Sequence, residues 1–534
     1  MSSAHLEVER KYEAPEVGIS ADLSAVKGLN ADPAVQDQQL EATYFDTAQR
    51  DLMQRRMVVR RRRGGHDEGW HLKFTDGGNR HEVHFPLLAD GTSMPAAVVR
   101  TLQGVTRGRQ LSPIAHLATH RRRTMLQDHQ GRHVAELCDD TVSAVDYATG
   151  ITRQWREWEV ELVDGAMPAE RQEEIFSAVE KALIQAGAKL STSGAKIARA
   201  LGHDADFDRA AGIEPAPSEP TPSESASAEA PGPDSRGEQH PSGQEGLPVL
   251  DESQRVISDL LSAVAVRLPV ADVAARVGVE WGFTRLAEGF AGYLGAIRSM
   301  EGILKDRSFA AQEQAALLVI EALEPVRRME EVLHGLPDLS LWDEQTERAR
   351  EELRRLGEED LRSERASAQS WLSGSEYLEA LETVCTFAQR PAIKRRQEGG
   401  LPKRFASNLL ERAGKELKQQ RKLSEDLREQ AEGSGAEEDA QAALRAWTVA
   451  RGMAESAAGL ADAVEEGLRL GGQKAKLVTK LRKEGRKVHR KERGVVVAEA
   501  MLVWLERAAR VFQRRDIDRL AVGMLIGELR ASRG

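Results

Sequence analysis

The stretch LEVERKY, residues 6–12, places a charged side chain at every second position. In a β-strand successive side chains point to opposite faces, so Glu7, Glu9 and Lys11 share one face, away from Leu6 and Val8. Two carboxylates and one ammonium are also what a solvated strand face carries, because one face of an antiparallel sheet often meets water. The rest of the first two hundred residues decides between a solvated face and a functional one.

The same alternation recurs further along the chain. Charged residues at every second position, or singly between apolar residues, are Arg60 and Arg62, Lys73, Arg80 and Glu82 with His84, Arg121 and Arg123, and Glu159 and Glu161. An ordinary sandwich turns its apolar faces inward and scatters charge outside. Here charges of both signs are concentrated on one strand face, with more arginines than the neighbouring acids can neutralise. This pattern favours a closed barrel with a charged interior.

A charged interior of this composition suits phosphate chemistry. Its acids would form an all-oxygen site for Mg²⁺ or Mn²⁺, and they are Glu7, Glu9, Glu159 and Glu161, with Asp140 as a fifth. Its bases would hold a multiply charged anion, and they are Arg60, Arg62, Lys73, Arg121, Arg123 and Lys196. Phosphoryl transfer needs both sets, because its catalysis is largely positioning and neutralisation of charge.

These motifs resemble those of CYTH domains, the triphosphate tunnel metalloenzymes, in order and approximate spacing. They are Glu7-x-Glu9-x-Lys11, Tyr44-Phe45-Asp46-Thr47, Arg60-x-Arg62, Lys73, Arg80-x-Glu82, Glu159-x-Glu161 and Lys196. The resemblance covers roughly residues 3 to 203. It implies an eight-stranded antiparallel tunnel that binds a linear triphosphate and hydrolyses it with Mg²⁺ or Mn²⁺.

The resemblance also implies a role for each residue. Metal ligands or water-positioning acids would be Glu7, Glu9, Asp140, Glu159 and Glu161, and the triphosphate clamp would be Lys11, Arg60, Arg62, Lys73, Arg121, Arg123 and Lys196. The catalytic set would be Glu7, Glu9, Lys11 and Glu82. A register shift of one residue in the runs 60–63 or 121–123 would turn the other arginines inward. Where the family often has serine, Ala195 precedes Lys196.

Length and composition predict more than one domain. A chain of 534 residues is too long for a single core, and its formal net charge is -10. We predict a tunnel domain over residues 1–207, a disordered linker rich in Pro, Ser and Glu over 208–249, and a helical domain over 250–534. Cys138 and Cys385 fall in different domains, which indicates a reducing, cytoplasmic location. We expect neither a signal peptide nor a membrane span.

The segment after Val249 changes to helical periodicity. Apolar stripes run through 316–333, 377–387, 405–427, 443–468 and 495–512, and Pro- or Gly-containing breaks separate them. These features predict an all-α helical bundle. The fold class is therefore α+β and multidomain, with an N-terminal antiparallel β tunnel and a C-terminal helical bundle.

Two helices of this segment carry basic stripes in a protein that is acidic as a whole. The clearest residues are Lys476, Lys480, Lys483, Lys487 and Arg490 on one helix, and Arg412 and Lys415 on another. Each stripe could be a solvated face or could bind a polyanion. Specific nucleic-acid binding is disfavoured, because the segment has no zinc-ligand spacing and few rings to stack on bases.

The order of tunnel, linker and helical bundle resembles CYTH-CHAD proteins, whose CHAD bundle binds inorganic polyphosphate. Arginines stand where that family places its motifs, as Arg327 with Arg328 and as Arg445 with Arg451. The histidines expected beside them are missing, since His334 and His489 alone follow the linker. The resemblance implies a divergent CHAD-like domain that binds polyphosphate through lysine and arginine.

Three hypotheses follow. The first is metal-dependent hydrolysis of inorganic triphosphate or polyphosphate, with the bundle binding polyphosphate and the linker raising its effective concentration at the tunnel. The second is an organic triphosphate hydrolase or cyclase of the same fold, whose specificity wall would use Trp70, His71, Trp155 or Trp158. The third is a non-catalytic polyphosphate-binding protein, which the acids in the proposed site disfavour because they would weaken binding of an anion.

Overall fold

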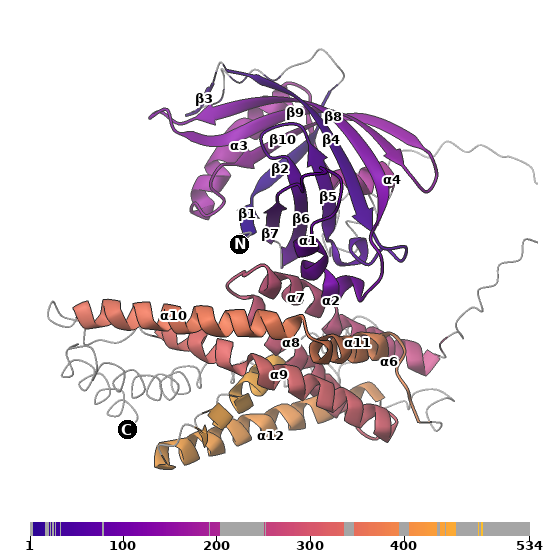
Figure 1. The fold of residues 1–534 in the computed structure, drawn as a ribbon, viewed down its shortest axis with the longest axis vertical. Coiled ribbons are helices and arrows are strands. Elements are labelled where there is room, and N and C mark those ends of the chain that lie inside the picture. The colour runs from indigo at the N-terminus through magenta and orange to yellow at the C-terminus, as the bar shows by residue number, and fades with distance from the viewer. Residues whose placement is uncertain are drawn as a thin grey trace, which may run out of the picture.

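The computed structural model of the 534-residue chain describes two regions. The described residues are 4–15, 21, 23, 26, 28–32, 34–76, 79–191, 193–202, 250, 252–335, 347–394, 405–434, 438–439, 441–443, 445–454, 479 and 482–483. The predicted linker, 208–249, lies outside them. Figure 1 shows a β-barrel with a layer of helices packed below it.

The N-terminal region is one antiparallel sheet of 11 strands in the order β1-β7-β6-β5-β4-β8-β9-β10-β2-β11, with β3 paired to β8. The strands are β1 (Ala4–Glu7), β2 (Glu9–Glu13), β3 (Asn30–Ala31), β4 (Gln36–Asp46), β5 (Val58–Arg63), β6 (Gly69–Asp76), β7 (Asn79–Phe85), β8 (Ser112–Gln127), β9 (His133–Asp146), β10 (Thr152–Leu162) and β11 (Lys189–Leu190). The helices of this region are η2 (Met53–Arg55), α1 (Ala96–Thr101), α2 (Gln103–Thr106), α3 (Ala169–Gln185) and α4 (Lys196–Leu201).

The opening stretch closes the sheet into a barrel. Its first half, β1, pairs with β7, and its second half, β2, pairs with β10 at the other end of the strand order. Only Val8 separates the two halves, so they act as one strand that joins both edges. Counted this way, with two-residue β3 and β11 set aside, eight strands remain among the described residues, as the tunnel prediction requires.

The barrel is inverted relative to an ordinary core, because its apolar side chains face outward. Val59, Leu72 and Val83 are buried outside the barrel wall against α1 and α2, whereas their neighbours Arg60, Lys73 and Glu82 line an internal cavity. Helix α3 covers the outer face of β2 and β10. Helix α4 packs on β8 and β9 through a shared apolar cluster. The helices therefore bury the apolar face and leave the interior to charged residues.

The described residues of the C-terminal region are mainly helical. Its named helices are α6 (Glu252–Ala265), α7 (Leu268–Arg276), α8 (Gly282–Ser299), α9 (Asp306–Gly335), α10 (Glu347–Leu372), α11 (Ser375–Gln389) and α12 (Phe405–Ser434). Residues 445–454 are also helical and pack on the same apolar core through Val449 and Met453. The barrel and this helical region confirm the α+β fold class, while the likeness to a CHAD domain stays a prediction.

The two regions share a core. Val273, Ala274 and Val277, on or next to α7, belong to the apolar cluster that covers β5, β6 and β7. The ring of Trp281 packs edge-on against His81 of β7, with 5.6 Å between centroids. In Figure 1, α2 and α7 lie between the barrel and the remaining helices. The helical region therefore completes the outer face of the barrel wall.

Candidate active site

The barrel encloses a cavity of about 840 Å³ with a charged wall. Its basic lining residues are Lys11, Arg56, Arg60, Arg62, Lys73, Arg80, Arg121, Arg123 and Lys196. Its acidic lining residues are Glu7, Glu9, Asp67, Glu82, Glu136, Glu159 and Glu161. A wall of nine bases and seven acids is suited to a ligand that carries several negative charges together with a cation.

Every predicted tunnel residue lies in this wall except Asp140. That side chain is fully buried behind the wall, where Arg121 binds it through two nitrogens at 2.7 and 2.6 Å. The strand register also decides which arginines of the runs 60–63 and 121–123 face the cavity. Arg61 faces outward and donates to the carbonyl of Thr92 at 2.9 Å, so Arg60 and Arg62 face the cavity. Likewise Arg122 is exposed beside Asp37.

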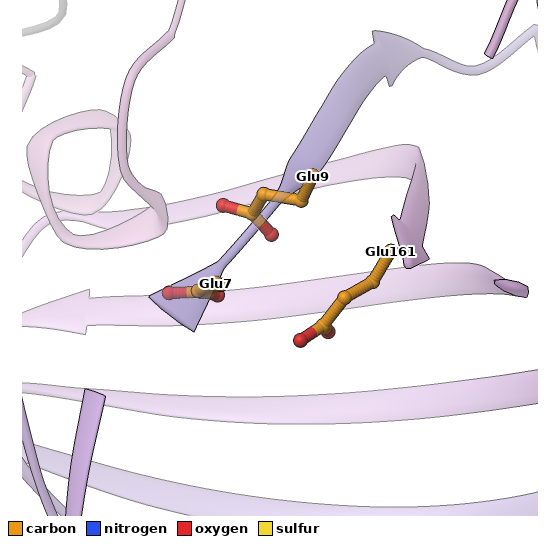
Figure 2. A group of neighbouring side chains, drawn as sticks. All are labelled: Glu7, Glu9 and Glu161. Carbon is orange, nitrogen blue, oxygen red and sulfur yellow. The ribbon is translucent and has the colours of Figure 1, made fainter. Parts of the chain in front are cut away.

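Three carboxylates meet at one point of the wall. Oxygens of Glu7, Glu9 and Glu161 all lie within 4.8 Å of one another. Figure 2 shows Glu7 and Glu9 on the interrupted first strand and Glu161 on the adjacent strand, with their carboxylates reaching into the same space. The pairing of Glu161 with Glu9 in the β2–β10 register fixes this arrangement. The first strand thus contributes two acids, one on either side of Val8, to the same face.

In this cluster, Glu7 with Glu9 and Glu161, the charge of Glu161 is the one that basic neighbours do not compensate. Burial, followed by repulsion from the other two carboxylates, raises the pKa of Glu161 to about 8. Within the described part of the chain, no basic side chain forms an ion pair with Glu161, and the buried Oε2 of Glu7 accepts no hydrogen bond. An all-oxygen donor set short of positive charge fits a hard divalent cation such as Mg²⁺ or Mn²⁺.

Basic residues border the cluster on two sides. Lys73 Nζ lies 2.6 Å from Glu7 and 3.3 Å from Glu82, so it bridges β1 and β7. Lys11 Nζ lies 3.0 Å from Glu9, which also pairs with Arg80. The cluster is therefore held in place by side chains that could exchange their carboxylate partners for phosphate oxygens.

A second acidic group, Asp140 with Glu157 and Glu159, is already neutralised. Lys196 Nζ lies 3.1, 2.5 and 2.6 Å from the three carboxylates in that order. Arg121 and Lys11 also bind Glu159, at 2.8 and 2.5 Å. Burial alone would raise the pKa of Glu159, but Lys11, Lys196 and Arg121 outweigh it and hold the pKa well below its usual range. This group therefore orients basic residues. Each of its three carboxylates has a basic partner, whereas Glu161 in the first cluster has none among the described residues.

Positive charge dominates another part of the wall. Burial, and then the guanidinium of Arg60, lowers the pKa of Arg62, to which Arg121 adds further repulsion. Asp67 compensates in part, at 2.6 Å from Arg62. Arg60 itself lies 3.7 Å from Glu82. Because Arg60 and Arg121 both repel the guanidinium of Arg62, an anion placed beside Arg62 would be bound favourably.

The orientation of Glu82 depends on a histidine. His71 Nδ1 lies 2.8 Å from Glu82 Oε1, and its Nε2 lies 2.9 Å from the carbonyl oxygen of Asp67. Since the Glu82 carboxylate and that carbonyl can both only accept, His71 donates to both when each ring nitrogen carries a proton. Burial lowers the pKa of His71. Glu82 is thereby held between His71 and Lys73.

The aromatic residues predicted as a specificity wall lie elsewhere. Trp70 is buried in the apolar cluster under α1 and α2, Trp158 packs with α3, and Trp155 packs with α4. His71 is engaged with Glu82. Within the described residues, the lining residues with rings are Tyr44, His66, Phe74 and His133, and the Phe74 ring is stacked on His81 in the outer apolar cluster. No stacked aromatic wall for a nucleobase is formed by these side chains.

Several lining residues were not predicted. Arg80 was recognised as part of a motif without a role, although its place two residues before Glu82 puts both on one strand face. Asp67 lies in a turn and Arg56 directly after η2, where strand alternation gives no signal. Glu157 is no lining residue but a buried partner of Lys196; it shares the strand parity of Glu159 and could have been found from it. Glu136 could similarly have been found from its spacing to Asp140 on β9.

The predicted polyphosphate residues are described only in part. Lys476, Lys480, Lys487 and Arg490 lie outside the described residues. Lys483 is exposed, and so are Arg412 and Lys415 on α12. In contrast, Arg327 is 1% exposed, and Arg451 lies 2.9 Å from Glu288. The arginines at the expected family positions thus neutralise buried carboxylates.

Comparison with known proteins agrees with the barrel architecture. The model of the CYTH domain family matches residues 5–200, which confirms the CYTH resemblance for this part of the chain. Two uncharacterized proteins of Mycobacterium tuberculosis, MT2285 and Rv2226, are each 35% identical over 222 residues, which is 40% of this chain. The match spans 43% of the length of either relative.

Solved structures similar to the chain include a candidate adenylate cyclase of Bacillus halodurans, with 18% identity and a TM-score of 0.25, covering 37% of this chain and 98% of that one. Another is HpAC1 of Hippeastrum, described as a candidate adenylyl cyclase with a dominant triphosphatase activity. It has 16% identity and a TM-score of 0.24, and covers 37% of this chain and 95% of that one. Among the described helices, none is long and apolar enough to cross a membrane.

Proposed function

We propose that the barrel is a metal-dependent hydrolase of inorganic triphosphate or polyphosphate. The observation that carries the proposal is the charge distribution in one cavity. A cluster of three carboxylates, in which Glu161 has no basic partner among the described residues, adjoins a wall of arginines and lysines. Enzymes that transfer phosphoryl groups combine metal-binding acids and phosphate-binding bases in this way. The matched CYTH family model supports the same chemistry.

The metal-binding residues would be Glu7, Glu9 and Glu161. Their proximity within 4.8 Å and the unpaired oxygen of Glu7 are the structural support for this assignment. A bound Mg²⁺ or Mn²⁺ would supply charge neutralisation for the phosphate oxygens. Asp140 and Glu159, also predicted as ligands, would instead hold Lys196, Arg121 and Lys11 in position, because those bases already occupy their oxygens.

The phosphate chain would bind between the two sides of the wall. Arg60, Arg62 and Arg121 would bind its oxygens, which relieves their mutual repulsion. Lys73 and Lys11 would bind the part nearest the carboxylate cluster. An acid of the cluster would orient a water in line with the terminal phosphorus, and no covalent intermediate is required.

The first experiment measures phosphate release from the full-length protein. Inorganic triphosphate, long-chain polyphosphate and ATP are compared with Mg²⁺, with Mn²⁺ and with a chelator. The proposal expects metal-dependent release that prefers the inorganic substrates, since Trp70, Trp155 and Trp158 are committed to packing outside the cavity. Preference for ATP would favour the organic-triphosphate alternative. Binding without release would favour the non-catalytic binder.

Matched variants connect the activity to the cavity. Arg62→Ala removes a wall guanidinium, whereas Arg61→Ala removes its outward-facing neighbour from the same strand. Loss of a charged hydrogen bond of about 1.5–3 kcal/mol raises the Michaelis constant roughly 10- to 150-fold. We expect this for Arg62→Ala and less than twofold for Arg61→Ala. Equal effects of the two variants would refute the assignment of the wall.

The carboxylates are tested by their metal dependence. Glu9→Gln and Glu161→Gln keep the side-chain volume but remove a charged ligand, so the metal concentration for half-maximal activity should rise in both variants. Lys11→Ala should raise the Michaelis constant and reduce turnover, because Lys11 contacts both acidic groups. If all these variants retain wild-type activity and metal dependence, the barrel is not the catalytic site.

A further inference from the structure

Three arginines adopt a backbone conformation that side-chain-bearing residues avoid. Arg50, Arg56 and Arg107 have φ angles of 60°, 55° and 49°. In this left-handed region the Cβ atom crowds the following carbonyl oxygen, so only glycine, asparagine and aspartate visit it routinely. Strain of this kind persists where the surrounding structure enforces it, and it concentrates at functional sites. Two of the three arginines lie in one turn, between β4 and β5.

Buried hydrogen bonds fix that turn. The carboxylate of Asp46 accepts from the backbone N–H groups of Thr47, Leu52 and Met53, at 2.7, 3.0 and 3.1 Å. Asp46 is fully buried, so water does not compete for these hydrogen bonds. The backbone N–H of Arg56 then donates to the carbonyl of Met53 at 3.0 Å and ends η2. The backbone of Arg56 is therefore held in its strained conformation by a rigid support.

That conformation delivers one of the two arginines to the cavity. Arg56 is a lining residue together with Tyr44, Val58 and Thr75, whereas Arg50, six residues earlier in the same turn, is not. Arg56 lies two residues before β5, the strand that carries Arg60 and Arg62 on its inner face. It lies at the end of β5 opposite His66, which follows the strand and also lines the cavity. The cavity thus runs along the whole of β5.

We infer that Arg56 is a further phosphate-binding residue, which extends the row of Arg60 and Arg62 toward the β4–β5 turn. This inference rests on the proposed function, because it requires that a linear phosphate chain occupies the cavity. A guanidinium is a suitable group for this position, since it stays charged when buried and binds two phosphate oxygens at once. Arg56 contacts the end of the phosphate chain nearest the β4–β5 turn.

The strained backbone makes Arg56→Gly an unusually clean test. Glycine removes the guanidinium and at the same time relieves the left-handed strain, so weaker binding cannot be attributed to lost folding. Arg50→Gly is the matched control, because it relieves the same strain in the same turn without touching the cavity. Arg56→Lys retains one positive charge and should restore part of the binding.

The assay is calorimetric titration of the full-length protein with inorganic triphosphate in the presence of chelator, followed by steady-state kinetics with metal. We expect Arg56→Gly to weaken binding about tenfold or more, with a matching rise in the Michaelis constant and turnover at saturation within about twofold. Arg50→Gly should bind as the wild type does. Thermal unfolding of both glycine variants should occur at or above the wild-type temperature.

The outcomes separate this inference from the proposed function. If the wild-type protein neither binds nor hydrolyses triphosphate, the proposed function fails and the inference fails with it. If the wild type binds and both glycine variants bind equally well, the proposed function stands and Arg56 is no phosphate ligand. If Arg56→Gly lowers turnover but leaves affinity unchanged, Arg56 acts on the reacting end of the chain and the inference is likewise overturned.

Discussion

Replacement of Asp272 by alanine tests whether the helical region and the barrel form one cooperative structure. Asp272, on α7, is 0% exposed and lies where α7 meets α2. Its carboxylate accepts two bonds from Arg276 Nε, at 2.9 and 3.0 Å, and one from the hydroxyl of Tyr377 at 2.8 Å. Arg276 in turn donates to the carbonyl of Arg100 in the barrel region at 3.2 Å.

The magnitude follows from what the substitution leaves behind. Removing one partner of a buried ion pair costs about 3–5 kcal/mol, because the other charge stays buried without compensation. The side chain of Arg276 is 6% exposed, so water cannot replace the carboxylate. Arg276 keeps the carbonyls of Arg100 and Leu372 as acceptors, which places the loss near the lower limit. We therefore expect Asp272→Ala to lose about 3 kcal/mol of unfolding free energy.

Urea denaturation monitored by tryptophan fluorescence measures this loss. With an m-value of about 3 kcal/mol/M, the midpoint should fall by about 1 M. Asp306→Ala is the control, because Asp306 pairs with Lys394 at 2.6 Å but is 89% exposed. That variant should lose less than about 1 kcal/mol. The double variant Asp272→Ala/Arg276→Met removes both charges and should recover part of the loss.

A small effect would refute the reasoning. If Asp272→Ala and Asp306→Ala lower the urea midpoint equally, the Asp272–Arg276 pair of α7, where this helix meets the barrel, is not energetically important. If the double variant is less stable than Asp272→Ala, Arg276 contributes chiefly through its bonds to backbone carbonyls. A second transition in Asp272→Ala alone would indicate that the variant uncouples the two regions.

Three further predictions concern other parts of the molecule. Gly104→Ala should lower the free energy of unfolding by about 1–3 kcal/mol in urea denaturation, because a Cβ there would lie 2.3 Å from the Asp272 carboxylate. An unchanged free energy of unfolding would mean that the contact between α2 and α7 rearranges at little cost. With chelator, stability should fall as the pH rises from about 5 toward 8, because folded Glu161, with a pKa of about 8, keeps a proton that the unfolded chain loses near 4.5. Glu161→Gln should flatten that dependence in urea midpoints measured across pH. The double variant Arg412→Glu/Lys415→Glu should weaken binding of long-chain polyphosphate severalfold without changing triphosphate hydrolysis; unchanged binding in a polyphosphate titration would make α12 a solvated face.

Strand parity made most of the cavity wall predictable. An alternation of two fixes the face of each side chain, so Glu7, Arg60 and Glu159 could be placed on one surface without knowledge of the fold. Inversion of the usual pattern, with Leu72 and Phe74 turned away from Lys73, then indicated that this surface is enclosed. The predicted α+β class followed from the change to helical periodicity after residue 249.

Two aspects of the site lie outside what parity can predict. The first is which carboxylates are neutralised, because that depends on where long flexible side chains end. Lys196 reaches three acids from the start of α4, so Asp140 and Glu159 differ from Glu161 although all three are acids on neighbouring strands. The second is Arg56, whose direction depends on a left-handed residue after a short helix. No periodic pattern covers such a position.

The contact between the two regions changes the expected division of labour. A tunnel joined to a bundle by a linker suggests independent domains, yet β7 carries Arg80 and Glu82 on its inner face and His81, packed on Trp281, on its outer face. Because adjacent residues of one strand serve both surfaces, a shift of the helical region must move the backbone that positions the site. Removing α7 would also expose the apolar outer face of β5, β6 and β7, which α1 and α2 cover only in part. The helical region therefore stabilises the barrel wall by covering its apolar outer face.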